Sequence, residues 1–93
     1  MATLRQVKQA QPEWFSRDNK RFFGDVSYRV LHSKATGDPY LVRKTSAFTD
    51  MFGQSKRYHY RINPLDSSTL KIQPLIDSEF GDLWAVKRWL KEH

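Results

Sequence analysis

Histidines and neighbouring charges are the residues in this chain best suited to acid–base or metal chemistry. His32, His59 and His93 are scattered, and none stands at metal-ligand spacing from carboxylates, so no metal site and no cofactor are expected. His59 lies between Arg57 and Arg61, where it could act as the general base of a nuclease-like site. The chain has no glycine-rich phosphate loop, no nucleophile elbow and no cysteine. We therefore expect a protein that is not an enzyme.

The segment 57–62 alternates between cationic and apolar residues, which is typical of a strand with one solvated face. The same alternation in neighbouring segments predicts a sheet with one apolar and one cationic face. No carboxylate occupies the outward positions, and such a face could follow a phosphate backbone. The alternative is that Arg and Lys only keep the outer face polar and protect the sheet edges. The candidate nucleic-acid-binding residues are Arg29, Arg43, Arg57, His59, Arg61 and Lys71.

A second candidate site is the segment 46–55, which is long for a hairpin connection. It contains Phe48, Met51 and Phe52, apolar side chains that are costly to expose. One interpretation is a helical turn that packs Phe48 and Phe52 onto the core. The other is a projecting loop that binds a partner protein or an exposed base.

Four segments with two-residue alternation are separated by turn-forming residues and are predicted to be strands: 25–31, 39–45, 58–62 and 70–73. If they are antiparallel neighbours, their aliphatic and tyrosine side chains share one face, and we expect the tyrosines to pack in the core. Leu31 and Leu41 would then interrupt the cationic face. The predicted apolar face consists of Val26, Tyr28, Val30, Tyr40, Val42, Tyr58, Tyr60, Ile62, Leu70 and Ile72.

A helix is predicted at each end of the chain. Thr3 as N-cap and Gln6 three residues later form a capping box for a helix over 3–10, which Pro12 ends. Asp77 or Ser78 is expected to cap the second helix. Its apolar residues at near-helical spacing are Phe80, Leu83, Trp84, Val86 and Leu90. Its later turns carry Lys87, Arg88 and Lys91, which oppose the helix dipole.

These elements predict an α+β fold in a single domain over residues 1–93. The order is N-terminal helix, four-stranded antiparallel sheet and C-terminal helix, with both helices on one sheet face. The formal net charge is +6, and residues 1–61 carry 12 Lys or Arg against 5 Asp or Glu. A positive potential attracts nucleic acid, anionic membrane or acidic protein without selecting among them. Because no signal peptide or membrane-spanning run is found, we expect a soluble cytoplasmic protein with no membrane partner.

Three short words along the chain are RFFG at 21–24, PYLV at 39–42 and YHYR at 58–61. Their order resembles a group of small uncharacterised proteins encoded by phages, plasmids and related mobile elements. The resemblance covers roughly residues 20–62 and omits the 51–53 segment and the helix with Trp84 and Trp89. It implies a setting in which small proteins often bind host nucleic acid or block a host protein, and it transfers no site residue.

The favoured function is non-enzymatic binding of nucleic acid through the cationic face, with phosphate contacts and no base-specific readout. The main alternative is a protein-interaction module that inhibits or modulates a host protein through the 46–55 loop, with the basic face as its rim. A structural subunit of a phage particle is a third possibility.

Overall fold

The computed structural model describes residues 2–19, 26–48, 56–76 and 79–93. In them the elements follow the order α1 (Leu4–Ala10), α2 (Pro12–Asn19), β1 (Val26–His32), β2 (Pro39–Phe48), β3 (Lys56–Pro64) and α3 (Leu83–Glu92). The strands form an antiparallel sheet in the order β1-β2-β3. The predicted α+β class is confirmed. The sheet of the described residues has three strands, where the sequence predicted four.

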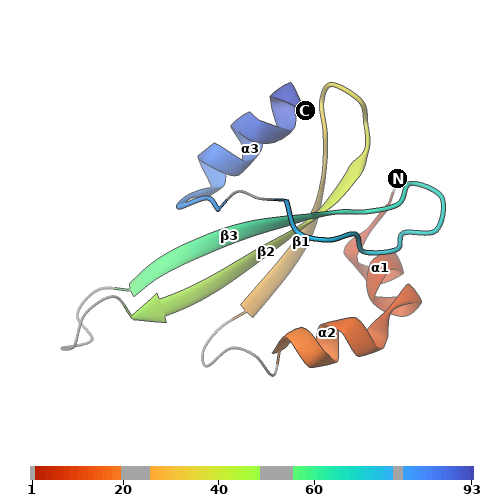
Figure 1. Cartoon of the computed structure of the whole chain (residues 1–93), viewed down its shortest axis with the longest axis horizontal. Helices are drawn as coiled ribbons and strands as arrows, with labels where there is room; N and C mark the ends of the chain where they lie inside the picture. Colours follow the sequence, from red (N-terminus) through yellow and green to blue (C-terminus); the bar gives the residue numbers. More distant parts are fainter. Residues whose placement is uncertain (1, 20–25, 49–55, 77–78) are drawn as a thin grey trace.

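Helices cover both faces of this sheet (Figure 1): α1 and α2 lie on one side and α3 on the other. The two faces have separate cores. Under α1 and α2 the buried residues are Val7, Phe15, Leu41 and Leu65. Under α3 they are Val42, Tyr60, Ile62, Val86 and Leu90. The prediction that both helices share one face is therefore wrong.

The register of the β1–β2 hairpin explains why. His32 is paired with Pro39, and this pairing places Tyr28 opposite Arg43. Directly opposed residues in antiparallel strands share a face. The pairing of β1 with β2 is thus shifted by one residue from the predicted pairing. The apolar side chains of β1 and those predicted to join them from β2 therefore lie on opposite faces of the sheet. Leu41 and Val42 are 0% and 1% exposed, so the central strand is buried on both faces.

The first helix begins as predicted. Thr3 Oγ1 accepts a hydrogen bond from the backbone N–H of Gln6 at 3.3 Å, and Gln6 Oε1 accepts one from the N–H of Thr3 at 3.0 Å. Helix α1 ends at Ala10. Pro12 then starts α2, a helix that the sequence analysis did not predict. Proline suits the first position of a helix because the N–H that it lacks would have no intrahelical acceptor there.

The predicted fourth strand, 70–73, is not a strand. Leu70 has φ 62°, in the left-handed region, which a strand does not adopt. The Gln11 side chain at the end of α1 donates to the Leu70 carbonyl at 2.8 Å and accepts from the Ile72 N–H at 3.1 Å. These contacts hold the segment against α1 through a side chain. Ile72 makes only an isolated bridge, to Leu65.

The C-terminal helix starts later than predicted. Asp82 is its N-cap, accepting from the Ala85 N–H at 2.8 Å, so the proposed caps at Asp77 or Ser78 are wrong. Phe80 lies before the helix and exchanges two backbone hydrogen bonds with Tyr60, at 2.8 and 3.0 Å. The chain before α3 thus runs along the outer edge of β3. Within the described residues, no helix has the length and apolar character that crossing a membrane requires.

Candidate functional site

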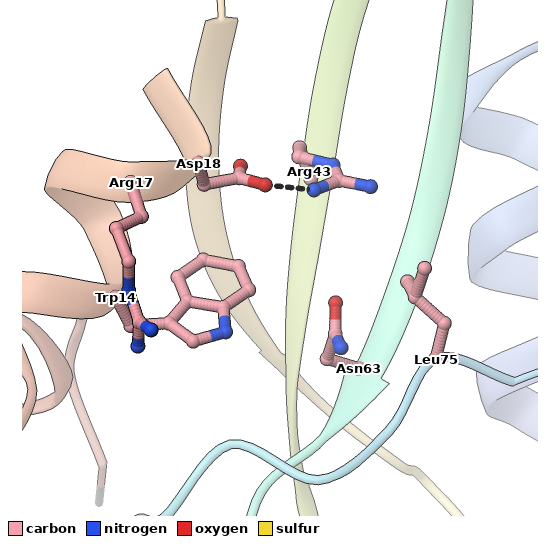
Figure 2. A pocket seen from close by; sticks show the side chains of 6 residues that line it. All are labelled: Trp14, Arg17, Asp18, Arg43, Asn63 and Leu75. Carbon is pink, nitrogen blue, oxygen red and sulfur yellow. Dashed lines mark hydrogen bonds and ion pairs between the residues drawn. The ribbon is translucent and has the colours of Figure 1, made fainter. Parts of the chain in front are cut away.

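Arg43, a predicted phosphate contact, is buried between α2 and the sheet. Its guanidinium donates to Oδ1 of Asp18, and the two residues are 6% and 4% exposed (Figure 2). The Tyr28 hydroxyl donates to the other oxygen, Oδ2 of Asp18, at 2.7 Å. Burying a charge is tolerable only when a partner compensates it. Arg43 therefore belongs to the interior of the fold and is not presented to a phosphate backbone.

The same network affects the titration of Tyr28. Burial, followed by the hydrogen bond to Asp18, raises the pKa of the Tyr28 hydroxyl well above its usual range. Ionisation would place a second negative charge against the Asp18 carboxylate. Tyr28 is therefore a hydrogen-bond donor to the ion pair, and it packs edge-on against Phe15 with a centroid distance of 4.9 Å. Tyr28 is partly buried and packs against the core under α1 and α2, and not on the Val42 face where it was predicted.

Arg61 and His59 lie at the surface and face one acidic residue, Glu79. Arg61 Nη2 donates to Glu79 Oε2 at 3.3 Å, and His59 Nδ1 lies 2.5 Å from Glu79 Oε1. All three side chains are nearly half exposed. A carboxylate thus accompanies two of the predicted cationic positions, which reduces the positive potential that they present.

Of the remaining predicted contacts, Arg29 and Lys71 lie apart from Arg61 and His59. Arg29 is exposed opposite Val42, on the sheet face that α3 covers. Lys71 is exposed in the connection after β3. Arg57 lies in β3 opposite Ala47. Because Arg43 is buried and Arg29 occupies the other face, the prediction of a single cationic sheet face is wrong.

The predicted 46–55 loop falls partly in a strand. Residues 46–48 belong to β2, and Phe48 is paired with Lys56. Met51 and Phe52 lie outside the described residues. A partner-binding role for this loop stays a prediction.

A different cationic surface lies on the solvent side of α3. Trp84 is 79% exposed, which is exceptional for a side chain of its size. Lys87, Arg88 and Lys91 follow it by three, four and seven residues and are all exposed. This spacing puts the indole and the three cations on one side of the helix. We call these four residues the basic face of α3; Glu92 is exposed at its border.

The connection between β1 and β2 adds a fifth cation next to this face. The Lys34 N–H donates to the Leu90 carbonyl at 3.1 Å, which ties the connection to the last turn of α3. Lys34 and Lys87 both line a hollow of about 220 Å³ together with His32. The positive charge of the basic face of α3 therefore continues onto the neighbouring loop.

This surface is not apparent from the sequence when Trp84 is placed in the apolar stripe of a longer helix. With the helix starting at Leu83, the residues that pack inward are Leu83, Val86 and Leu90. Trp84 is out of phase with this set and in phase with Lys87 and Lys91. The positions of these residues around the helix can be read from the sequence once the first residue of the helix is known.

The described residues contain no group of three or more His, Cys, Asp or Glu side chains that could hold a metal ion. No protein-family model, curated protein or solved structure matches the chain. The resemblance to small proteins of mobile elements stays a prediction.

Proposed function

We propose that this protein binds single-stranded nucleic acid, without catalysis, through the basic face of α3. The observation that carries the proposal is the exposed indole of Trp84 among Lys87, Arg88 and Lys91. An indole can stack on any base, and cations beside it can pair with the flanking phosphates. The combination fits a partner that offers flat rings and negative charge in alternation.

Single strands are favoured over a duplex because their bases are accessible. Stacking on a protein aromatic contributes about 1–3 kcal/mol per base, whereas bases inside a duplex already stack on one another. Phosphate contacts from Lys and Arg carry no base identity. The proposal thus includes little sequence specificity. It replaces the predicted sheet cations, because Arg43 is buried and Arg61 faces Glu79.

The test is a fluorescence-anisotropy titration of labelled single-stranded DNA, RNA and duplex DNA at several salt concentrations. Three phosphate contacts should give a log–log salt slope near −2 on single strands, from about −0.7 per phosphate. Replacing Trp84 with Ala should weaken single-strand binding by roughly 5- to 150-fold, the equivalent of 1–3 kcal/mol. Quenching of Trp84 fluorescence on binding should accompany stacking.

A pair of charge-reversal variants separates the two surfaces at equal net charge. Lys87→Glu with Arg88→Glu removes two cations from the basic face of α3. Arg29→Glu with Lys71→Glu removes two exposed cations that the sequence analysis favoured. The first variant should lose single-strand binding, and the second should lose only the modest part due to net charge. Equal losses in both variants, or no binding by the native protein at low salt, would contradict the proposal.

A further inference from the structure

A polar pocket of about 300 Å³ lies between α2 and the sheet, on the face opposite to α3. The described residues that line it are Trp14, Arg17, Asp18, Arg43, Asn63 and Leu75. In Figure 2, Trp14 and Leu75 stand on opposite sides, and Arg43 and Asn63 lie between them. This volume is at the low end of small-molecule sites.

Asn63 presents a buried acceptor in this pocket. The residue is 4% exposed, and its Nδ2 donates to the Gln73 carbonyl at 2.9 Å, which fixes the orientation of the amide. Its Oδ1 is buried and has no hydrogen-bond partner among the residues that the structure describes. Figure 2 shows this oxygen directed toward the space beside Arg43. A buried acceptor without a donor is costly, so the position favours a ligand that brings an N–H or O–H.

The charges of the pocket favour an anion. Asp18 has both oxygens engaged, one by Arg43 and the other by Tyr28. Its negative charge is compensated by the Arg43 guanidinium. Arg17 is exposed and lines the same pocket, so the described lining residues carry one positive charge in excess. An indole and an aliphatic side chain on either side provide apolar walls suited to a flat ring.

We propose that this pocket binds a nucleobase of the uracil type, whose edge carries an N–H beside a carbonyl, together with an attached phosphate. The base N–H donates to Asn63 Oδ1, and the neighbouring carbonyl lies toward the guanidinium side of the pocket. The ring lies between Trp14 and Leu75, and the phosphate pairs with Arg17. The site is on the other face of the sheet from the basic face of α3, and it does not depend on the proposed function.

The experiment is a ¹H–¹⁵N NMR titration of the full chain with uridine 5′-monophosphate, observing the Trp14 indole N–H and the Asn63 side-chain amide. Both resonances should shift and saturate. N3-methyluridine 5′-monophosphate lacks the N–H for Asn63 and should bind at least tenfold more weakly. Inorganic phosphate alone should give no saturating shift at Asn63. Equal binding of the methylated and unmethylated nucleotides would overturn the proposal.

Two further experiments test whether the base is recognised in a free nucleotide or within a strand, and provide a control for variants that misfold. Oligouridine in place of the mononucleotide tests a base within a strand; saturation by either compound supports the site, and saturation by neither overturns it. Arg17→Gln, an exposed change, should weaken the mononucleotide about tenfold and leave uridine binding unchanged. The Lys87→Glu, Arg88→Glu protein should keep the mononucleotide shifts, so this site and the basic face of α3 can fail separately.

Discussion

The two faces of the sheet differ in whether charged side chains are buried against them. On the face under α1 and α2, an arginine of the central strand is buried with an aspartate of a helix. On the face under α3, the buried residues are apolar or tyrosine, and the cations lie outside on the helix that covers them. The first face holds a buried ion pair within the fold, and the helix over the second presents cations to solvent.

This difference shows why a count of cations along strands does not identify a binding surface. The guanidinium of Arg43 cannot contact a large anion unless α2 moves away and Asp18 is left behind. The cations of α3 are already solvated, so contact with a phosphate would not disturb the core. Binding of a polyanion through exposed cations is therefore proposed on the side of the molecule where charge is not needed for packing.

The largest expected effect comes from breaking the buried ion pair. Asp18→Asn keeps the size of the side chain and removes its charge from a buried guanidinium. Loss of one partner of a buried pair typically costs about 3–5 kcal/mol. We expect a loss of this order in the free energy of unfolding, measured by urea denaturation.

A matched control is the exposed pair on the same protein. Glu79→Gln removes the carboxylate that faces Arg61, in a pair whose side chains are 47% and 45% exposed. Exposed pairs contribute about 0–1 kcal/mol. If Asp18→Asn costs no more than Glu79→Gln, the buried pair stabilises the fold no more than an exposed pair does.

The second prediction tests whether the sheet is covered on both sides. Leu41 and Val42 are neighbours in β2 that pack against different helices. Leu41→Ala should lower the free energy of unfolding by about 2–5 kcal/mol because it leaves a cavity under α1 and α2. With both helices on the Val42 face, Leu41 would be a surface residue and its truncation nearly neutral. Leu75→Ala, at a residue that is 39% exposed, is the control.

Much of the local structure could be predicted from the sequence. The capping box of Thr3 and Gln6 acts within one turn of helix, and the alternation in 26–31, 39–45 and 58–62 acts within one strand. The faces could not be predicted in the same way. They depend on the pairing of His32 with Pro39, and a shift of one residue moves every side chain of β1 to the other face.

The candidate site was harder to predict than the fold. Burial of Arg43 requires Asp18, which lies 25 residues earlier on a helix that was not anticipated. The basic face of α3 depends on where the helix begins, and Asp82 is one of several acidic or hydroxyl residues that could serve as N-cap. Once that start is known, the exposure of Trp84 follows from its distance to Val86 and Leu90.

The third prediction concerns the tyrosine that completes the buried network. Tyr28→Phe removes the donor to Asp18 Oδ2, and a hydrogen bond to a charged group contributes about 2 kcal/mol. We expect a loss of this size in urea denaturation. As a control, Ser27→Ala, at the exposed neighbouring position in β1, should change the free energy of unfolding little.

The raised pKa of Tyr28 adds a pH dependence with a defined sign. The stability that the neutral hydroxyl contributes is fully present below the unfolded pKa of about 10 and is lost as the pH rises above it toward the folded value. Ultraviolet titration should show one tyrosine of the native protein ionising after the others. Tyr28→Phe should remove this late step, and its persistence in the variant would assign it to another tyrosine.

The fourth prediction compares two tryptophans on opposite sides of α3. Trp84→Ala should change the free energy of unfolding by no more than about 0.5 kcal/mol, since the indole is 79% exposed. Trp89 packs edge-on against Tyr40 at a centroid distance of 5.4 Å, and Trp89→Ala should cost roughly 2 kcal/mol, less than a fully buried indole. If Trp84→Ala is the more destabilising, the indole is part of the core and not of a binding surface.

The smallest effect is expected at Asp66, in the turn after β3, where charge is neither buried nor on the basic face of α3. The backbone N–H groups of Thr69 and Ser68 donate to Asp66 Oδ1 at 2.9 and 2.8 Å, and these bonds lower the pKa of the carboxyl. The stability that the turn gains is present above the unfolded pKa of about 4 and is lost as the pH falls through the folded value. A ¹³C NMR titration should find Asp66 more acidic in the native chain than in the same chain in urea. Asp66→Asn keeps the accepting oxygen and should remove that pH dependence while leaving the turn intact, because the hydrogen bonds need an oxygen there and not a charge.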